Sequence, residues 1–241
     1  MKIEVWSDFV CPFCYIGKRR LEEAVKNFEY KEEVELVFRS FELDKDAKKK
    51  YDENINEIIA KKYDIPVEEA KSLNDQIVLQ AKAVGLNYNF DGLIPTNTFD
   101  AHRLLQYAKT KGRANELEER ILKAYFVESL DISNYEILAK LAFEVGLDSN
   151  EALKILEFNE YGEEVRKDEE KALKLKVSGV PYFVFDNKYA VSGAQPSEVF
   201  LEALQKVKKE ELSSKLIEVE SENKDNEASK GANCSDGKCR I

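Results

Sequence analysis

The sequence predicts an α/β fold in which a β-α-β unit and a later β-β-α unit build one sheet, with an all-helical segment between them. Three observations predict it. Apolar residues alternate as in strands near residues 2–6, 34–38 and 182–191. They recur every three to four residues through the long middle of the chain. The opening is strand, helix, strand, which favours a right-handed crossover and a parallel strand pair.

The first unit, residues 1–45, is expected to hold a strand over Lys2–Trp6, a helix from Pro12 and a strand over Val34–Phe38. Proline suits the first helical position because its missing N–H would have no partner there. Apolar residues after Pro12 follow helical spacing. This unit therefore supplies one half of the predicted sheet.

Residues 46–160 show helical periodicity and almost no strand signal, so we expect an inserted helical domain. Ser133 and Glu136 have the spacing of a capping box and predict the start of one helix. We interpret the apolar stripes of these helices as core packing. One such stripe contains Leu117, Ile121, Leu122, Tyr125 and Phe126.

The second unit, residues 161–217, has a buried-strand pattern over Tyr182–Phe185, turn residues at Asp186 and Asn187, and a partner strand over Tyr189–Val191. A helix follows from Pro196. Together the two units have the element order of a thioredoxin fold with a helical domain inserted in its middle. Residues 218–241 are polar and lack aromatic residues, so we expect a flexible tail.

Charge and hydropathy limit the classes of partner. The 241 residues include 37 basic and 47 acidic residues, a net charge of −10, which argues against binding to nucleic acid or anionic membranes. No apolar run approaches the roughly 18 residues of a membrane span, and the first residues lack the pattern of a secretory signal. We therefore expect a soluble protein of the cytoplasm with neither nucleic-acid nor membrane partners.

The four cysteines form two close pairs, Cys11/Cys14 and Cys234/Cys239. Because the cytoplasm keeps thiols reduced, such pairs indicate redox or metal chemistry rather than structural disulfides. Cys11 stands at a predicted helix start, where unpaired N–H groups and the helix dipole stabilise a thiolate. This spacing predicts Cys11 as the attacking thiol and Cys14, one turn later, as the resolving thiol.

Zinc binding is the alternative, because zinc sites use the same two-residue spacing and the tail pair could complete four ligands. The position of Cys11 and Cys14 between a strand and an amphipathic helix favours the redox interpretation. We therefore assign no metal and no other cofactor.

The segment Gly179-Val180-Pro181 directly precedes the strand Tyr182–Phe185. Proline is tolerated at the first residue of a strand, so structure alone could explain it. Its place after the helical insert is that of the cis-proline loop of a thioredoxin fold. A cis bond there exposes the backbone of the preceding residue, here Val180, to a substrate strand beside the active cysteines.

With these segments the chain resembles the DsbA-type thioredoxin family, and most its FrnE-like cytoplasmic branch of dithiol–disulfide isomerases. The resemblance rests on residues 7–17, 97–103, 178–185 and 192–195. It implies a thiol–disulfide oxidoreductase or isomerase with catalytic Cys11 and Cys14 and the cis-proline Pro181. The implied partners are disulfide-containing proteins or small thiols such as glutathione.

Two departures from the strongly oxidising members predict a milder redox poise. No histidine lies between the cysteines. In addition, Asp8 would oppose thiolate formation if its carboxylate approached Cys11. The sole histidine, His102, lies in a family-like stretch of the insert, so it is either a structural residue or part of the active-site cleft.

Two other functions compete with this one. Glutathione-dependent transferases and isomerases of the kappa and hydroxychromene-carboxylate types resemble this fold and insert, but they have a single serine or similar residue in place of Cys11. A chaperone-like peptide-binding protein would use the same cleft without needing either cysteine. The sequence leaves the oligomeric state open.

The pair Cys234/Cys239 suggests a second dithiol that relays electrons to Cys11/Cys14. About 20 polar residues separate it from the last core helix, and a flexible linker of that length typically spans about 25 Å. We therefore expect the tail to reach the active site of its own chain.

Overall fold

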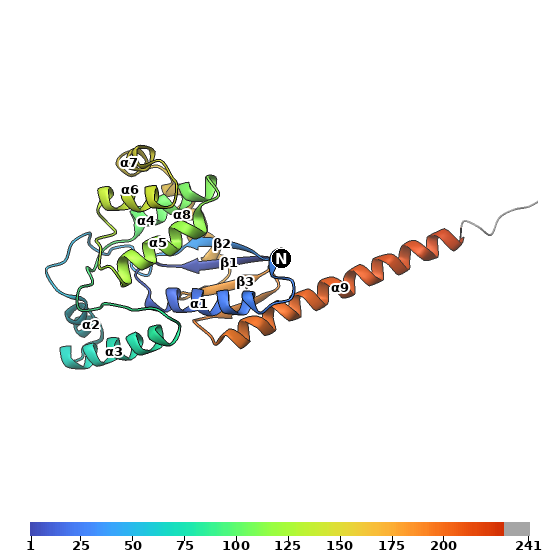
Figure 1. Ribbon diagram of the computed structural model, residues 1–241, viewed down its shortest axis with the longest axis horizontal. Coiled ribbons are helices and arrows are strands. Elements are labelled where there is room, and N and C mark those ends of the chain that lie inside the picture. Colours follow the sequence, from blue (N-terminus) through green and yellow to red (C-terminus); the bar gives the residue numbers. More distant parts are fainter. Residues whose placement is uncertain (229–241) are drawn as a thin grey trace, which may run out of the picture.

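The computed structural model describes residues 1–228, in which a four-stranded sheet has helices on both faces (Figure 1). Within these residues, no helix combines the length and apolar character that crossing a bilayer requires. The strands are β1 (Lys2–Ser7), β2 (Glu35–Ser40), β3 (Tyr182–Phe185) and β4 (Tyr189–Ser192). The helices are α1 (Pro12–Lys26), α2 (Ile55–Tyr63), α3 (Val67–Ala83), α4 (Phe99–Thr110), α5 (Ala114–Phe126), α6 (Tyr135–Glu144), α7 (Ser149–Glu157), α8 (Gly162–Lys174) and α9 (Ser197–Ala228), with a short 3-10 helix at Lys31–Glu33.

The sheet has the order β2-β1-β3-β4 and confirms the predicted thioredoxin fold. β1 and β2 are parallel and are connected through α1, whereas β3 is antiparallel to β1 and β4. The β3–β4 hairpin turns at Asp186 and Asn187, whose φ angles are 47° and 54°. Both values suit the tight turns that follow the twist of two paired strands.

Helices cover both faces of the sheet and bury one large and one small hydrophobic cluster in the described residues. α1 and α9 pack together on one face, where Phe200 of α9 meets Phe183 with ring centroids 4.7 Å apart. α8 covers the other face, where Ala172 packs with Trp6. The main hydrophobic cluster includes residues of the sheet, of α1 and of the insert. The division at residues 46 and 160 therefore separates segments of the chain but does not separate two cores.

Two expectations about helix ends are wrong. The helix predicted from Ser133 and Glu136 begins one residue later, because the side chain of Asn134 accepts the N–H of Ile137 at 3.0 Å and caps α6. α9 extends to Ala228, so residues 218–228 of the expected tail are helical. The remainder of that tail, with Cys234 and Cys239, lies outside the described residues.

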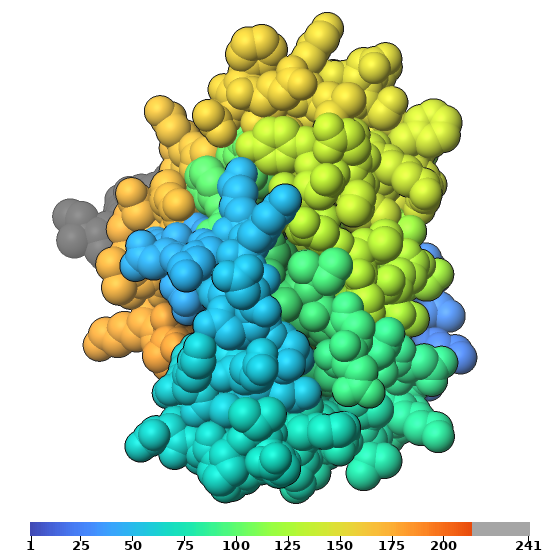
Figure 2. All heavy atoms as spheres, turned by 90° about the vertical axis from the view of Figure 1, so that its left-hand side faces the viewer, coloured from blue at the N-terminus to red at the C-terminus, as the bar shows by residue number. Residues whose placement is uncertain are grey.

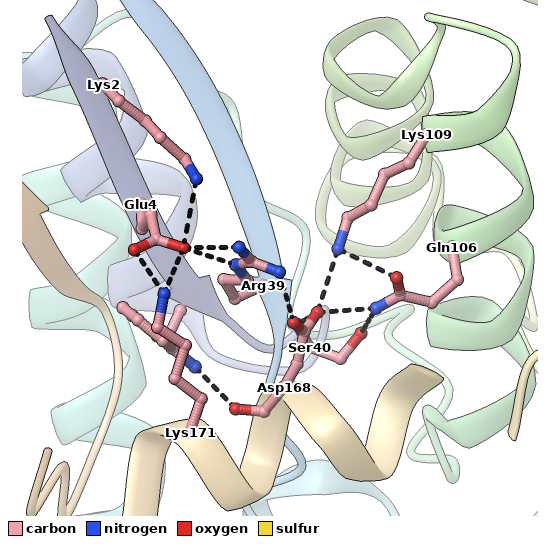
Figure 3. A network of polar contacts seen from close by, with 9 residues as sticks. Lys2, Glu4, Arg39, Ser40, Gln106, Lys109, Asp168 and Lys171 are labelled. Carbon is pink, nitrogen blue, oxygen red and sulfur yellow. Dashed lines mark hydrogen bonds and ion pairs between the residues drawn. The ribbon is translucent and has the colours of Figure 1, made fainter. Parts of the chain in front are cut away.

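A buried carboxylate joins the insert to the sheet (Figure 3). Asp168 of α8 accepts the backbone N–H of Ser40 at 3.1 Å and the side chains of Arg39, Gln106 and Lys109 at 2.7–2.9 Å. Burial disfavours its charged form, but the cations Lys109 and Arg39 and the amide of Gln106 outweigh that cost and lower the pKa of Asp168. One side chain thus holds β2, α4 and α8 together.

We expect Asp168→Ala to lower the free energy of unfolding by about 3–5 kcal/mol, because it leaves Lys109 without its buried counter-charge and removes one of the carboxylates that pair with Arg39. Urea unfolding at neutral pH measures this loss. Since the pKa of Asp168 is lowered by folding, its contribution is present above its unfolded-state pKa of about 3.9 and declines as the pH falls through the folded-state value. The difference between the two proteins should therefore shrink in acid.

Glu53→Ala is the matched control, because Glu53 forms an exposed ion pair with Lys61 at 2.6 Å and exposed pairs contribute little to stability. Equal losses in the two variants would contradict a special role for Asp168.

Candidate active site

The loop after β1 places Cys11 at the start of α1. The N–H of Cys11 donates to the carbonyl of Asp8 at 3.1 Å, which closes a turn. Cys11 is the N-cap residue with extended backbone angles, and Pro12 follows in the first turn, as predicted. The first-turn side chains, Pro12–Tyr15, are uncharged at neutral pH. The positive end of the helix dipole therefore faces the Cys11 sulfur without a competing carboxylate from this turn.

Cys11 and Cys14 are both free cysteines and have different surroundings. The exposed fractions of Cys11 and Cys14, 4% and 3%, do not distinguish them. Cys14 Sγ accepts the backbone N–H of Asp8 at 3.5 Å. Burial, with the neighbouring Cys11 sulfur, raises the pKa of the Cys14 thiol well above its usual range. Cys14 is therefore held in its protonated form.

The loop before β3 lies against Cys11. The Val180–Pro181 peptide bond is cis, as expected from the sequence, and Cys11 Sγ donates to the Val180 carbonyl at 3.4 Å. Gly17 of α1 permits this approach, because a Cβ atom there would lie 3.0 Å from Pro181 Cγ and 3.2 Å from the Phe183 ring. The missing side chain of Gly17 thus allows α1 to pack directly on the Pro181 loop.

His102 fixes the loop that precedes Cys11. Its Nε2 lies 3.3 Å from Asp8 Oδ1, while Asp8 Oδ2 accepts the N–H of Leu43 at 2.7 Å. The imidazole packs on Phe9 with ring centroids 4.8 Å apart and is 1% exposed. Burial disfavours the imidazolium, but the Asp8 carboxylate outweighs it and raises the pKa of His102. His102 is a buried residue behind the loop and does not line an open cleft.

The insert contributes contacts to the site that the sequence interpretation did not identify. The Tyr88 hydroxyl donates to the Pro12 carbonyl at 2.8 Å. Ser7 Oγ donates to the buried carboxylate of Glu118 at 2.8 Å. A usable signal existed for Glu118, because it lies three, four and seven residues before the apolar residues 121, 122 and 125 and therefore on the same helix face.

Glu119, the next residue, binds three side chains of α1. Its carboxylate accepts the Tyr15 hydroxyl at 2.5 Å and pairs with Lys18 at 2.7 Å and with Arg19. Burial opposes ionisation, yet Arg19 and Lys18 lower the pKa of Glu119 to about 2. Helix α5 of the insert is thus attached both to the loop before Cys11 and to the helix after it.

The end of the molecule at which β1 terminates is largely covered by the insert, whose residues run from blue to yellow across the face in Figure 2. This covering agrees with the small exposed fractions of both thiols. In residues 1–228, no group of three or more His, Cys, Asp or Glu side chains is placed to hold a metal ion. The zinc alternative would need ligands from Cys234 and Cys239, outside that range.

The family model of the DSBA-like thioredoxin domain matches residues 2–205. The chain belongs to this family. Its members are thiol–disulfide oxidoreductases, and the order of strands, the insert and the cysteine-bearing helix described above are those of the DsbA-like fold.

Three individual proteins illustrate the similarity. YwbO of Bacillus subtilis (strain 168) is 31% identical over 207 residues, which make up 84% of this chain and 94% of that protein. The crystal structure of a probable DsbA oxidoreductase from Streptomyces coelicolor has a TM-score of 0.82 and 40% identity, covering 86% of this chain and 89% of that one. The cytosolic disulfide reductase DsbM from Pseudomonas aeruginosa with GSH shares the fold, with a TM-score of 0.61 and 15% identity over 86% of this chain and all of that one.

We expect Gly17→Ala to destabilise the protein by about 1 kcal/mol, because overpacking against Pro181 costs roughly 1–3 kcal/mol and the higher helix propensity of alanine returns about 1 kcal/mol. Urea unfolding measures the change. Gly179→Ala is the matched control in the same region, since a Cβ atom there meets nothing within 4 Å. Greater loss in the control than in Gly17→Ala would contradict the close approach.

Proposed function

We propose that this chain is a dithiol–disulfide oxidoreductase or isomerase in which Cys11 attacks and Cys14 resolves. The observation that supports it is the asymmetry of the two thiols. Cys11 is the N-cap residue of α1 beside the Val180 carbonyl, whereas Cys14 lies one turn later and has a raised pKa. A thiol held protonated is a poor first nucleophile, because the thiolate is the reactive form. This favours Cys11 as the thiol that meets the substrate.

The reaction then runs in two exchanges. The Cys11 thiolate attacks one sulfur of a substrate disulfide, forms a mixed disulfide and releases the other sulfur as a thiolate. Cys14 next attacks the Cys11 sulfur, which releases the substrate's second thiolate and leaves a Cys11–Cys14 disulfide. The reverse sequence oxidises a substrate dithiol. Isomerisation uses the first exchange alone, when a substrate thiol displaces Cys11 from the mixed disulfide.

The Val180–Pro181 loop is the proposed substrate-binding element. Its Val180 carbonyl accepts from Cys11, so a substrate backbone N–H that takes this position would bring its own sulfur next to Cys11. Phe13, between the cysteines, is 38% exposed and offers an apolar contact beside the same point. An extended peptide segment or a small thiol such as glutathione fits this arrangement.

We place the protein in the cytoplasm, in the FrnE-like branch, acting on disulfide-containing proteins or on glutathione. The cytosolic disulfide reductase DsbM, which shares this fold, supports the location. The structure of DsbM with GSH supports the class of partner through its shared fold. Net acidity again argues against nucleic acid or membranes as partners.

We expect Cys14→Ser to accumulate a stable mixed disulfide at Cys11 and to lose turnover in insulin reduction by at least about 100-fold, because serine cannot resolve the adduct. Mass spectrometry of the protein after incubation with oxidised glutathione detects the adduct, and peptide mapping locates it. Cys11→Ser should lose both the adduct and turnover.

Other outcomes identify the competing functions. Binding of glutathione with conjugating or isomerising activity in Cys14→Ser, and no disulfide reduction by the wild type, would point to the kappa or hydroxychromene-carboxylate type. Suppression of peptide aggregation that survives loss of both cysteines, without any disulfide exchange, would point to a chaperone-like protein.

The pair Cys234/Cys239 adds an electron relay to this proposal. Because α9 continues to Ala228 and leads away from the start of α1 (Figure 1), the 25 Å coil estimate does not apply to residues 218–228. We therefore expect exchange between two chains. In Cys14→Ser, a Cys11 adduct with Cys234 or Cys239 should link two chains and increase with protein concentration on non-reducing gels.

Replacement of both tail cysteines by serine is the control and should abolish these linked chains. Unchanged turnover in that variant, together with no adduct in Cys14→Ser, would exclude the relay.

A further inference from the structure

A buried glutamate stands behind the resolving cysteine. Glu118 of α5 is 1% exposed, and its Oε1 accepts the Ser7 hydroxyl at 2.8 Å. Its Oε2 is buried and has no hydrogen-bond partner among residues 1–228. A buried carboxylate oxygen without a partner is costly when charged, which favours uptake of a proton. In agreement, burial raises the pKa of Glu118 despite its contact with Ser7.

Ser7 connects this carboxylate to Cys14. It is the last residue of β1, directly before Asp8, whose backbone N–H donates to Cys14 Sγ. The Ser7 side chain is also within hydrogen-bonding reach of Cys14. A serine hydroxyl has one proton and two lone pairs. While it donates to Glu118, it can accept a hydrogen bond from the Cys14 thiol.

Given the proposed dithiol function, we propose that Glu118 takes up the proton of Cys14 through the Ser7 hydroxyl when Cys14 resolves the mixed disulfide. The Cys14 S–H proton passes to Ser7 Oγ while the Ser7 O–H proton passes to Glu118 Oε1. The Cys14 sulfur bonds to the Cys11 sulfur, and the bond from Cys11 to the substrate sulfur breaks. The substrate leaves as a thiolate with the electron pair of that bond. The two protein sulfurs are oxidised to a disulfide and the substrate sulfur is reduced.

The relay gives the proton of the buried Cys14 thiol an acceptor inside the protein. Cys14 is 3% exposed, so bulk hydroxide or a buffer base reaches its proton poorly. Transfer to Glu118 moves one negative charge from a carboxylate to a sulfur within the same buried site, and no additional charge is created in a low-dielectric region. Running backwards, the neutral Glu118 returns the proton when Cys14 is the leaving group. Glu118 thus serves both directions of exchange without contact with substrate.

The groups around Cys14 and Glu118 define how the rate of resolution by Cys14 depends on pH. Cys14 is faced by Cys11, by the backbone N–H of Asp8 and by Ser7. Three cationic or ionisable groups approach Glu118 from two helices, and they limit how far its pKa rises: His102 and Lys109 of α4 and Lys18 of α1. His102 is also paired with Asp8 and faces Glu42. Replacing any of these neighbouring groups would shift the pH dependence of the rate. The test therefore uses variants of Glu118 and Ser7, which keep these neighbours in place.

The test follows the reaction with the chromogenic disulfide 5,5′-dithiobis(2-nitrobenzoate) in the full-length chain with Cys234→Ser and Cys239→Ser, so that Cys11 and Cys14 are the remaining thiols. Attack by Cys11 releases the first chromophore at a rate that depends on reagent concentration. Resolution by Cys14 releases the second at a rate that does not. The two steps are thus measured separately in one protein.

Glu118→Gln keeps an oxygen that accepts from Ser7 but cannot take up a proton. We expect it to slow the second phase by about tenfold or more near pH 7, with the first phase changed less than about twofold, on the scale of general acid–base contributions. The deficit should shrink as the pH rises, because hydroxide then removes the Cys14 proton. Ser7→Ala should behave in the same way, and Ser7→Thr should restore the second phase.

Glu42→Gln is the matched control, since Glu42 is also buried with an unpartnered oxygen within the described residues and faces His102, but it pairs with Arg166 instead of Ser7. Equal slowing in the control, or a Glu118→Gln deficit that is constant across pH, would overturn the relay, as would an unchanged second phase. If Glu118→Gln does not fold, the Ser7→Ala and Ser7→Thr pair decides. Chromophore release that persists without Cys11, or a single phase in the parent protein, would instead overturn the dithiol function.

Discussion

The end of β1 imposes the constraint on which the rest of the structure depends. Four consecutive residues, Trp6–Phe9, are at least 96% buried, although three of them carry polar groups. Buried polar groups need partners, and the strand itself cannot supply them. The indole of Trp6 donates to the Asp168 carbonyl, Ser7 donates to Glu118, and Asp8 binds His102 and the N–H of Leu43. All of these partners come from the segment between β2 and β3.

Two of these partners, Glu118 and His102, belong to the insert, which therefore helps to build the candidate active site. It is continuous with the core that surrounds the sheet, and its helix α5 is fixed to α1 through Glu119. The segment between β2 and β3 supplies hydrogen-bond partners to the buried loop that places Cys11 at the start of α1. A small four-stranded sheet alone would leave that loop in water, where neither thiol would be shielded.

The sequence predicted the features that local pattern determines. Strand alternation identified all four strands, Asp186–Asn187 marked the hairpin, and the spacing of Cys11 and Cys14 after a strand located the helix start. It did not predict which insert residues meet the loop, because Ser7–Glu118 and Asp8–His102 join residues 111 and 94 positions apart, and such pairs depend on how the helices pack. The capping box at Ser133 failed for a local reason, since Asn134 offers an equally good cap one residue later. The tail boundary at residue 218 failed because α9 extends beyond the part of the chain that packs on the core.

Two adjacent glutamates of α5 act on opposite sides of the cysteine pair because successive helical residues point about 100° apart. Glu119 stays ionised beside Lys18 and Arg19 and fixes α1, the helix that begins next to Cys11. Glu118 faces inward, where burial raises its pKa, and contacts only the Ser7 side of the site. The same residue type therefore has opposite proton affinities one position apart, set by solvent access and by the nearest cations. Helix α5 therefore holds an ionised carboxylate against α1 and a carboxylate of raised pKa against Ser7.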